Sequence, residues 1–162
     1  MKNFFRKNKK GFTIIEVLIA CAIMSLITIS LMSAATRGIE LSNRALRQVQ
    51  AGLLLEEGVE AVKSIRDADW NNISGLSLDT NYYLSFDVNT NTWVLNDTVE
   101  VIDEIFTRIV VFSEVYRDNN DDIASTGTLD DGTKQVSVTV SWLASGNIIS
   151  KNINFYLTNI FD

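Results

Sequence analysis

The chemistry of the N-terminal segment centres on one carboxylate, that of Glu16. It is the only charged side chain in the run from Phe12 to Ala35. A charged side chain at the centre of a membrane span costs about 2.5 to 3.5 kcal/mol, so an acid inside a membrane usually has a partner. We therefore expect Glu16 to form an ion pair with a positive group. The alternative is an acid tolerated at the membrane interface, because Glu16 lies near one end of the run.

Nucleophiles and metal-binding side chains are scarce. The chain has no histidine and a single cysteine, Cys21, which excludes an intrachain disulfide and both Ser-His-Asp and Cys-His catalysis. The same shortage disfavours zinc and other transition-metal sites in the soluble part. Acids are plentiful, but nothing in the sequence places two of them in a common cleft. We assign no catalytic residue and expect that the protein is not an enzyme.

Residues 18–21, Leu-Ile-Ala-Cys, resemble the lipobox of a lipoprotein signal. Two features argue against that interpretation: Glu16 interrupts the apolar run before the cysteine, and the residues after Cys21 stay apolar where a lipoprotein would begin a polar tether. We interpret Cys21 as a packing residue on a membrane helix.

The segment from Asp118 to Thr133 contains a pattern that suggests calcium. Asp118, Asn120 and Asp122 have the alternate spacing of a calcium loop, but Ile123 and Leu129 stand where an EF-hand needs glycine and glutamate. A calcium site of another geometry would use the carboxylates of Asp118, Asp121, Asp122, Asp130 and Asp131. The alternative is a long, acidic, solvated connection between two strands, closed by a turn at Asp131-Gly132. We expect no other cofactor.

Charge is distributed unevenly along the chain. The residues before Gly11 include five basic side chains and no acid, which leaves nine basic residues against 20 acidic ones in the remainder. An acidic body of this kind argues against a nucleic-acid partner.

The elements that position these residues begin with a long helix. As a helix, the run from Phe12 to Ala35 is about 36 Å long, enough for a bilayer core of about 30 Å. The chain contains no proline, so the helix is expected to continue to Arg66. Its soluble half is expected to pack on the head through one face, formed by Leu46, Val49, Leu53, Ala61, Val62 and Ile65. Trp70 is expected to fill the junction between helix and sheet.

The rest of the chain has the pattern of strands. Residues 82–95 predict a short hairpin, residues 105–117 a longer strand, and residues 148–161 a return strand. Between them, residues 135–143 alternate strictly, with Val136, Val138, Val140 and Trp142 on one face. We therefore predict an α+β fold in which an antiparallel sheet packs on the soluble half of the helix. The predicted divisions are a basic leader (1–11), a transmembrane helix (12–35), the soluble half of that helix (36–68) and a β-rich head (69–162).

Lys9-Lys10-Gly11, then residues 12–16 with the sequence Phe-Thr-Ile-Ile-Glu, then an apolar helix, resemble the class III signal of type IV pilins and type II secretion pseudopilins. The resemblance implies that a prepilin peptidase cuts between Gly11 and Phe12 and methylates the new amine of Phe12. It also implies that Glu16 pairs with that amine, commonly on a neighbouring subunit. The leader, with Lys9 and Lys10, would stay on the cytoplasmic side, as the positive-inside rule also predicts.

The same resemblance implies a pilin-like fold and a structural role. The expected protein is a minor pilin or pseudopilin, of the modification or assembly-initiating type, that assembles into a type IV pilus or related filament. Its expected partners are the prepilin peptidase, other pilin subunits, the inner-membrane assembly platform and membrane lipid. It would be a single-pass inner-membrane protein with its head outside the cytoplasm, and later part of a pilus or periplasmic pseudopilus. The alternative is an anchored extracytoplasmic binding module that never polymerises, or a lipoprotein attached through Cys21.

Overall fold

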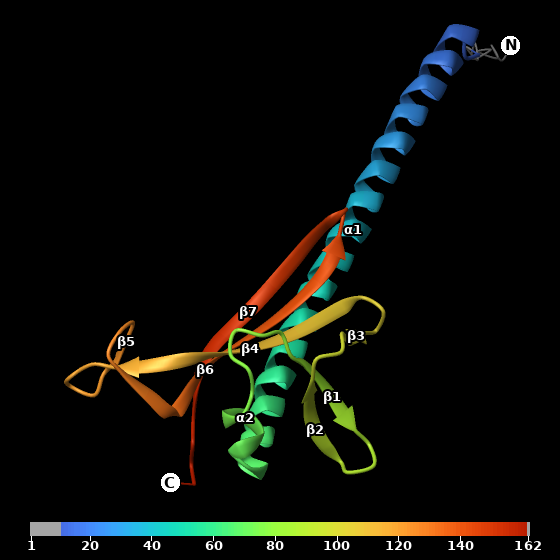
Figure 1. Ribbon diagram of the computed structural model, residues 1–162. Helices are drawn as coiled ribbons and strands as arrows, with labels where there is room; N and C mark the ends of the chain where they lie inside the picture. The colour runs from blue at the N-terminus through green and yellow to red at the C-terminus, as the bar shows by residue number, and fades with distance from the viewer. Residues whose placement is uncertain (1–10, 162) are drawn as a thin grey trace, which may run out of the picture. The chain divides into compact units, whose positions relative to one another are not determined.

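The computed structural model describes residues 11–161, which begin with one long helix (Figure 1). Helix α1 spans Ile14–Ala68 and contains 55 residues, which confirms the predicted single helix. Without proline, no residue in it lacks the backbone N–H that a helix requires. The described residues form two compact units, one up to Ala45 and the other from Leu46 onward.

The second unit contains the remaining elements, a short helix and two antiparallel sheets (Figure 1). The short helix α2 spans Asn71–Ser74, and Trp70 before it is partly buried against the core, as expected. Strands β1 (Tyr83–Asp87) and β2 (Thr92–Asn96) form the predicted hairpin. The larger sheet has the order β3-β4-β6-β7, with β5 paired to one end of β4. Its strands are β3 (Val101–Ile102), β4 (Phe106–Arg117), β5 (Ile123–Ala124), β6 (Thr128–Ala144) and β7 (Asn147–Thr158).

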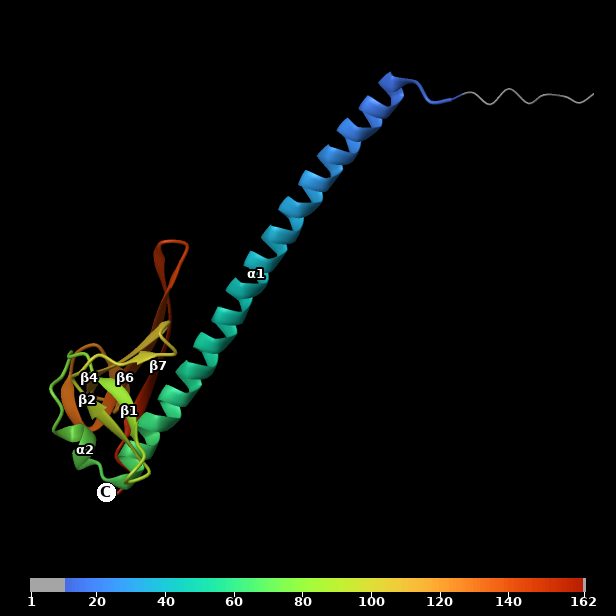
Figure 2. The same ribbon diagram turned by 90° about the vertical axis from the view of Figure 1, so that its right-hand side faces the viewer.

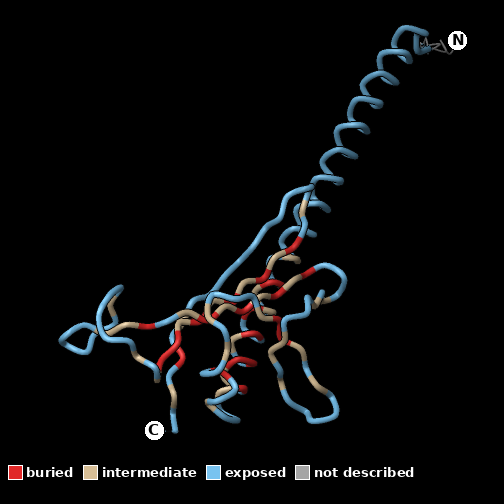
Figure 3. The backbone as a smooth tube through the Cα atoms, in the orientation of Figure 1, coloured by how far each residue is buried: buried red, intermediate tan, exposed pale blue. Residues whose placement is uncertain are grey.

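The core lies between the larger sheet and the C-terminal part of α1. The inward face of β6 is buried as predicted, through Val136, Val138, Val140 and Trp142. Helix residues Ala51, Leu55 and Val62 belong to the same buried cluster, and Figure 3 shows the buried positions gathered in this unit. The predicted α+β fold with an antiparallel sheet is therefore confirmed. The buried alternate residues of β6 pack with residues from one side of helix α1 in a single core.

The face by which α1 packs on the sheet is only partly the predicted one. Ala61, Val62 and Ile65 are buried, but Leu46, Val49 and Leu53 are 56%, 61% and 60% exposed. The buried face is completed instead by Ala51, Leu55 and Gly58. A side chain at Gly58 would place its Cβ 2.9 Å from Val138 Cγ1, so the helix lies too close to the sheet for larger residues there. The prediction was wrong because the residues that face the sheet recur at spacings of four and three residues from Ala51 through Leu55 and Gly58, and Leu46, Val49 and Leu53 lie on another side of the helix.

The acidic connection between β4 and β6 is shorter than predicted. Asp131 and Gly132 lie inside β6, so the expected turn at these residues is wrong. The chain turns back before β6, at Gly127, whose φ of 151° suits glycine and where a Cβ would collide with the backbone carbonyl of Arg117. Arg117 then holds the start of β6 through an ion pair of 2.7 Å between its Nε and Asp130 Oδ2.

Candidate functional site: the start of the N-terminal helix

The residues on both sides of the predicted cleavage bond are open to a protease. Gly11, Phe12 and Thr13 belong to no helix or strand, and Phe12 is 88% exposed. No described atom outside its chain neighbours lies within 4 Å of where a Cβ of Gly11 would be. Exposed, irregular backbone is the form of substrate that proteases cut. The leader charges Lys9 and Lys10 lie outside the described residues.

Glu16 has a partner within the chain, and that partner is Thr13. Glu16 Oε2 accepts a hydrogen bond from the backbone N–H of Thr13 at 3.0 Å and another from Thr13 Oγ1 at 3.0 Å. Thr13 immediately precedes the first helical residue, Ile14, and Glu16 is the third residue of the helix. This is the spacing of a capping box, in which an acid satisfies a backbone donor at the helix start. The role of Thr13 was not predicted from the sequence, although the Thr-x-x-Glu spacing is a known signal for it.

The capping arrangement directs the carboxylate toward the predicted cleavage bond. The backbone nitrogen of Thr13, which donates to Glu16, follows directly after the backbone nitrogen of Phe12 in the chain. Cleavage after Gly11 would convert the Phe12 nitrogen to an amine. Negative charge is also favoured at a helix N-terminus by the helix dipole. Glu16 is therefore stabilised before any amine exists, and it lies close in the chain to where the amine would form.

Several hydroxyl groups in the first part of α1 bond to the backbone of the helix itself. The hydroxyls of Ser25, Thr28 and Ser30 donate at 2.8 Å to backbone carbonyls four residues earlier. In lipid, where water cannot replace a missing hydrogen bond, such internal bonds are required. By length and composition α1 can cross a membrane, and its most apolar stretch is fully exposed, as the uniform pale blue in Figure 3 shows. Cys21 is also exposed on this helix.

A buried arginine joins three elements of the second unit. Arg108 on β4 is 3% exposed, and its Nη1 donates to Glu57 Oε2 at 2.6 Å and to the carbonyl of Leu54 at 3.1 Å. Its guanidinium carbon lies 5.3 Å from the ring centroid of Trp93 on β2, which is within cation–π range. Arg108 thus links the sheet to α1 and to the small hairpin. This cluster was not predicted from the sequence. The signal that could have indicated it is the charged Arg108 at an inward strand position between Phe106 and Val110.

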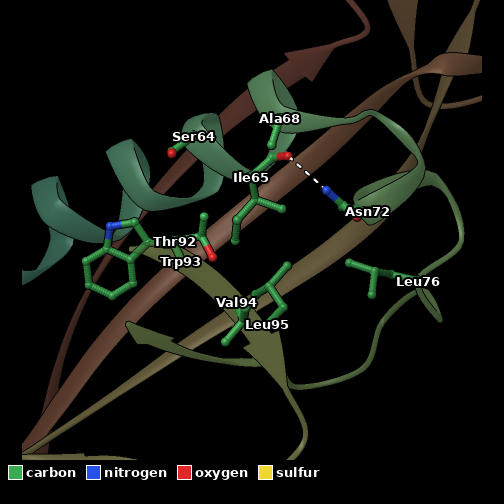
Figure 4. Close-up of a pocket in the computed structure, with 9 residues that line it drawn as sticks. All are labelled: Ser64, Ile65, Ala68, Asn72, Leu76, Thr92, Trp93, Val94 and Leu95. Atoms are coloured by element: carbon green, nitrogen blue, oxygen red, sulfur yellow. Dashed lines mark hydrogen bonds between the residues drawn. The ribbon is translucent and has the colours of Figure 1, made fainter. Parts of the chain in front are cut away.

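A cleft of about 390 Å³ lies between the end of α1, α2 and β2 (Figure 4). All the residues that line it are uncharged, and the amide of Asn72 donates to the carbonyl of Ile65 at 3.5 Å. The lining contains no acid, base or thiol. The potential nucleophiles in the lining are the hydroxyls of Ser64 and Thr92, and the lining has no acid or base beside them to activate a hydroxyl.

The acidic segment is organised by Arg117 and by backbone amides. Arg117 Nε contacts Asp130 Oδ2 and, at 3.7 Å, Asp121 Oδ1, and its hydrogen bond lowers the pKa of Asp130. Asp118 Oδ1 accepts the backbone N–H groups of Asn120 and Asp122, which accounts for their alternate spacing as a loop feature. Within residues 11–161 no three acidic or thiol side chains group closely enough to hold a metal ion. Calcium binding stays a prediction from the sequence.

The described start of the chain thus combines an exposed bond after Gly11, a capped Glu16 and an apolar helix long enough to cross a membrane. Residues 6–32 match the family model described as the prokaryotic N-terminal methylation motif. The chain therefore carries the class III signal of type IV pilins, and its long helix and antiparallel sheets form a pilin-like fold. No curated protein matches the chain, and no solved structure matches it either.

Proposed function

We propose that this chain is a minor pilin or pseudopilin, a structural subunit of a type IV pilus or a related filament. The observation that carries the proposal is the capped Glu16, directed toward the bond after Gly11 at the start of an apolar helix. A simple signal anchor needs no carboxylate at this position. A subunit that must pair with a newly formed amine does.

The proposed sequence of events begins with insertion of the helix into the inner membrane, leader inside and head outside the cytoplasm. The peptidase cuts between Gly11 and Phe12 and methylates Phe12. The assembly platform then extracts the subunit into a filament whose N-terminal helices pack together. Packing these helices removes apolar surface from contact with water outside the membrane, which stabilises the filament.

Glu16 exchanges partners during this process. In the single chain its carboxylate holds the neutral donors of Thr13. A charged amine is a stronger donor, because charge-assisted hydrogen bonds are about twice as strong as neutral ones. The amine of a neighbouring subunit therefore competes with Thr13 for the carboxylate, and this competition fixes the axial position of the new subunit.

Mass spectrometry of the mature N-terminus tests the proposal. The expected chain begins at methylated Phe12, and a Gly11→Leu control, which alters the residue before the cut without touching the span, is expected to keep its leader. An intact Met1 or a lipid on Cys21 in the wild-type chain would contradict the proposal. A chain that is processed but stays entirely in the membrane fraction would favour the anchored binding module that never polymerises.

A further inference from the structure

The larger sheet has two faces of different character. Its inner face packs on the C-terminal part of α1, so its outer face is turned away from that part of the helix (Figure 2). Because directly paired residues of antiparallel strands lie on the same face, the registers of β4, β6 and β7 define the outer face row by row. The rows of this outer face are Thr107, Ser141 and Ser150; Ile109, Thr139 and Asn152; Val111, Ser137 and Asn154; and Ser113, Gln135 and Tyr156.

None of the residues in these rows is charged. Apart from Ile109, Val111 and Tyr156, their side chains end in a hydroxyl or an amide. The outer residues of β7 are exposed, and those of β6 are half-buried. The chain after Gly11 has nine basic and 20 acidic residues, so charge is abundant elsewhere in the head. Hydroxyls and amides both donate and accept hydrogen bonds, and they suit a ligand that is itself uncharged and rich in hydroxyls.

A cleft of about 440 Å³ lies at the end of the outer face where β5 pairs with β4 (Figure 1). Its lining includes Gln135 and Tyr156 from the outer face, together with Glu114, Tyr116 and Ser125. The cleft and the outer face are therefore continuous. Small-molecule pockets have volumes of about 300 to 1,000 Å³, so the cleft is large enough for a small ligand. Tyr156 is 49% exposed, which leaves its ring open to contact.

Glu114 and Tyr116 hold each other in place within the cleft. The Tyr116 hydroxyl donates a hydrogen bond to Glu114 Oε2, so both side chains are positioned before a ligand arrives, which reduces the entropic cost of binding. The described lining contains no lysine or arginine, so an anionic ligand would meet Glu114 without a cation to pair with. A purely apolar ligand would remove Glu114 and Gln135 from water without replacing their hydrogen bonds. The cleft therefore favours a ligand that is uncharged and polar.

We propose that the cleft and the outer face bind an uncharged saccharide chain whose sugars have equatorial substituents, such as β-linked glucose or N-acetylglucosamine. Each ring of such a chain presents a flat C–H face, which packs on an aromatic ring, and a rim of hydroxyls. Tyr116 and Tyr156 supply the aromatic surfaces, and Glu114 and Gln135 bond to the hydroxyls. The rows of the outer face extend the contact to further sugars. The inference goes beyond the proposed function, because the site lies in the head and does not depend on polymerisation.

The test is isothermal titration calorimetry of the full-length chain in a detergent that has no sugar groups. The probes are the hexasaccharides of β-1,4-linked glucose and of β-1,4-linked N-acetylglucosamine, each with its disaccharide. We expect at least one hexasaccharide to bind, and to bind more tightly than its disaccharide. Tyr156→Ala should weaken binding by about tenfold or more, and Tyr156→Phe, which keeps the ring, by less than about threefold. The matched control is Phe161→Ala, which removes a 60% exposed aromatic ring outside the sheet and should leave binding unchanged.

A further variant separates the outer face from the cleft. Asn154→Lys places a long charged side chain on the outer face beside Tyr156, and we expect it to weaken the hexasaccharide to the level of the disaccharide without changing the disaccharide. Thermal unfolding of each variant at the wild-type temperature excludes a folding defect.

Three results would overturn the proposal. The first is that neither hexasaccharide binds the wild-type chain, and the second is that Phe161→Ala weakens binding as much as Tyr156→Ala. The third is that a trimethyllysine peptide binds in place of the saccharides, which would assign the two tyrosines and Glu114 to a cation. All three leave the proposed function standing, because that function is judged separately by the mature N-terminus and by the filament fraction.

Discussion

The two halves of α1 differ in where their packing partners come from. From Ile14 to Ala45 every residue is exposed, and the hydroxyls of Ser25 and Thr28 bond to the helix itself. From Leu46 to Ala68 a stripe of small and apolar residues is buried against the chain's own sheet. The second half is thus completed by folding, whereas in the proposed function the first half is covered by lipid or by other subunits.

Two glutamates, one in each half of α1, show the same difference in where their partners come from. Glu16 is exposed and holds its neighbour Thr13, so its charge remains available to an outside partner. Glu57 pairs with the buried Arg108, a partner that lies 51 residues away in the chain. Changes at Glu16 should therefore affect assembly and spare the fold, and changes at Glu57 should do the reverse.

The largest expected effect tests the first half. Glu16→Leu should leave membrane insertion and cleavage intact but lower incorporation into filaments by more than about tenfold. Glu16→Gln separates charge from capping, because glutamine can form the same capping box without a charge. We expect Glu16→Gln to be nearly as defective as Glu16→Leu in the filament fraction. Wild-type incorporation of the glutamine variant would mean that capping alone suffices.

The next effect tests the second half. Glu57→Ala leaves the buried guanidinium of Arg108 without its carboxylate, which should destabilise the head by about 3 kcal/mol. Arg108→Met leaves behind a carboxylate that is 48% exposed and can be hydrated, so it should cost less, about 1 kcal/mol. Urea unfolding of the full chain, followed by tryptophan fluorescence, measures both. Equal losses would show that the unpaired buried charge is not the main cause of the destabilisation.

Glycine substitutions sharpen the comparison within one helix. Gly58→Ala should destabilise the head by about 1 to 3 kcal/mol, because its Cβ would lie 2.9 Å from Val138 Cγ1 and 3.0 Å from Arg108 Cδ. Gly52→Ala should stabilise it by up to about 1 kcal/mol, since the site is open and alanine favours the helix. Thermal unfolding of the two variants should shift in opposite directions. A shift of the same sign in both would contradict the close approach at Gly58.

The smallest expected effect concerns acid stability of the head. The hydrogen bond from Arg117 lowers the pKa of Asp130, so the folded state holds this carboxylate ionised more strongly than the unfolded state does. Its stabilising contribution is present above the unfolded pKa of about 3.9 and is lost as the pH falls through the lower folded value. Asp130→Asn should therefore reduce the loss of stability between neutral and strongly acid pH. The exposed neighbour Asp131→Asn is the control, and an equal change in both variants would contradict the specific role of Asp130.

The strands were predictable because their signals are local. Alternation along residues 135–143 identified the buried face of β6, and the turn residues between 82 and 95 identified the β1–β2 hairpin. The turn expected at Asp131-Gly132 was wrong because the conformation of these two residues depends on contacts with other segments of the chain. The ion pair between Arg117 and Asp130 and the pairing of β5 with β4 draw these residues into the start of β6.

By itself, the sequence determined the N-terminal signal, the long helix and the antiparallel head, because charge, apolar run length and alternation depend only on neighbouring residues. Only the tertiary structure decided which side of α1 faces the sheet. Leu46, Val49 and Leu53 are as apolar as the residues that are buried, but the close approach at Gly58 sets the side of α1 that carries Gly58 and Leu55 against the sheet and leaves Leu46, Val49 and Leu53 exposed. The tertiary structure also decided that Arg108 contacts Glu57 and Trp93, since contacts between residues far apart in the chain depend on how the elements pack.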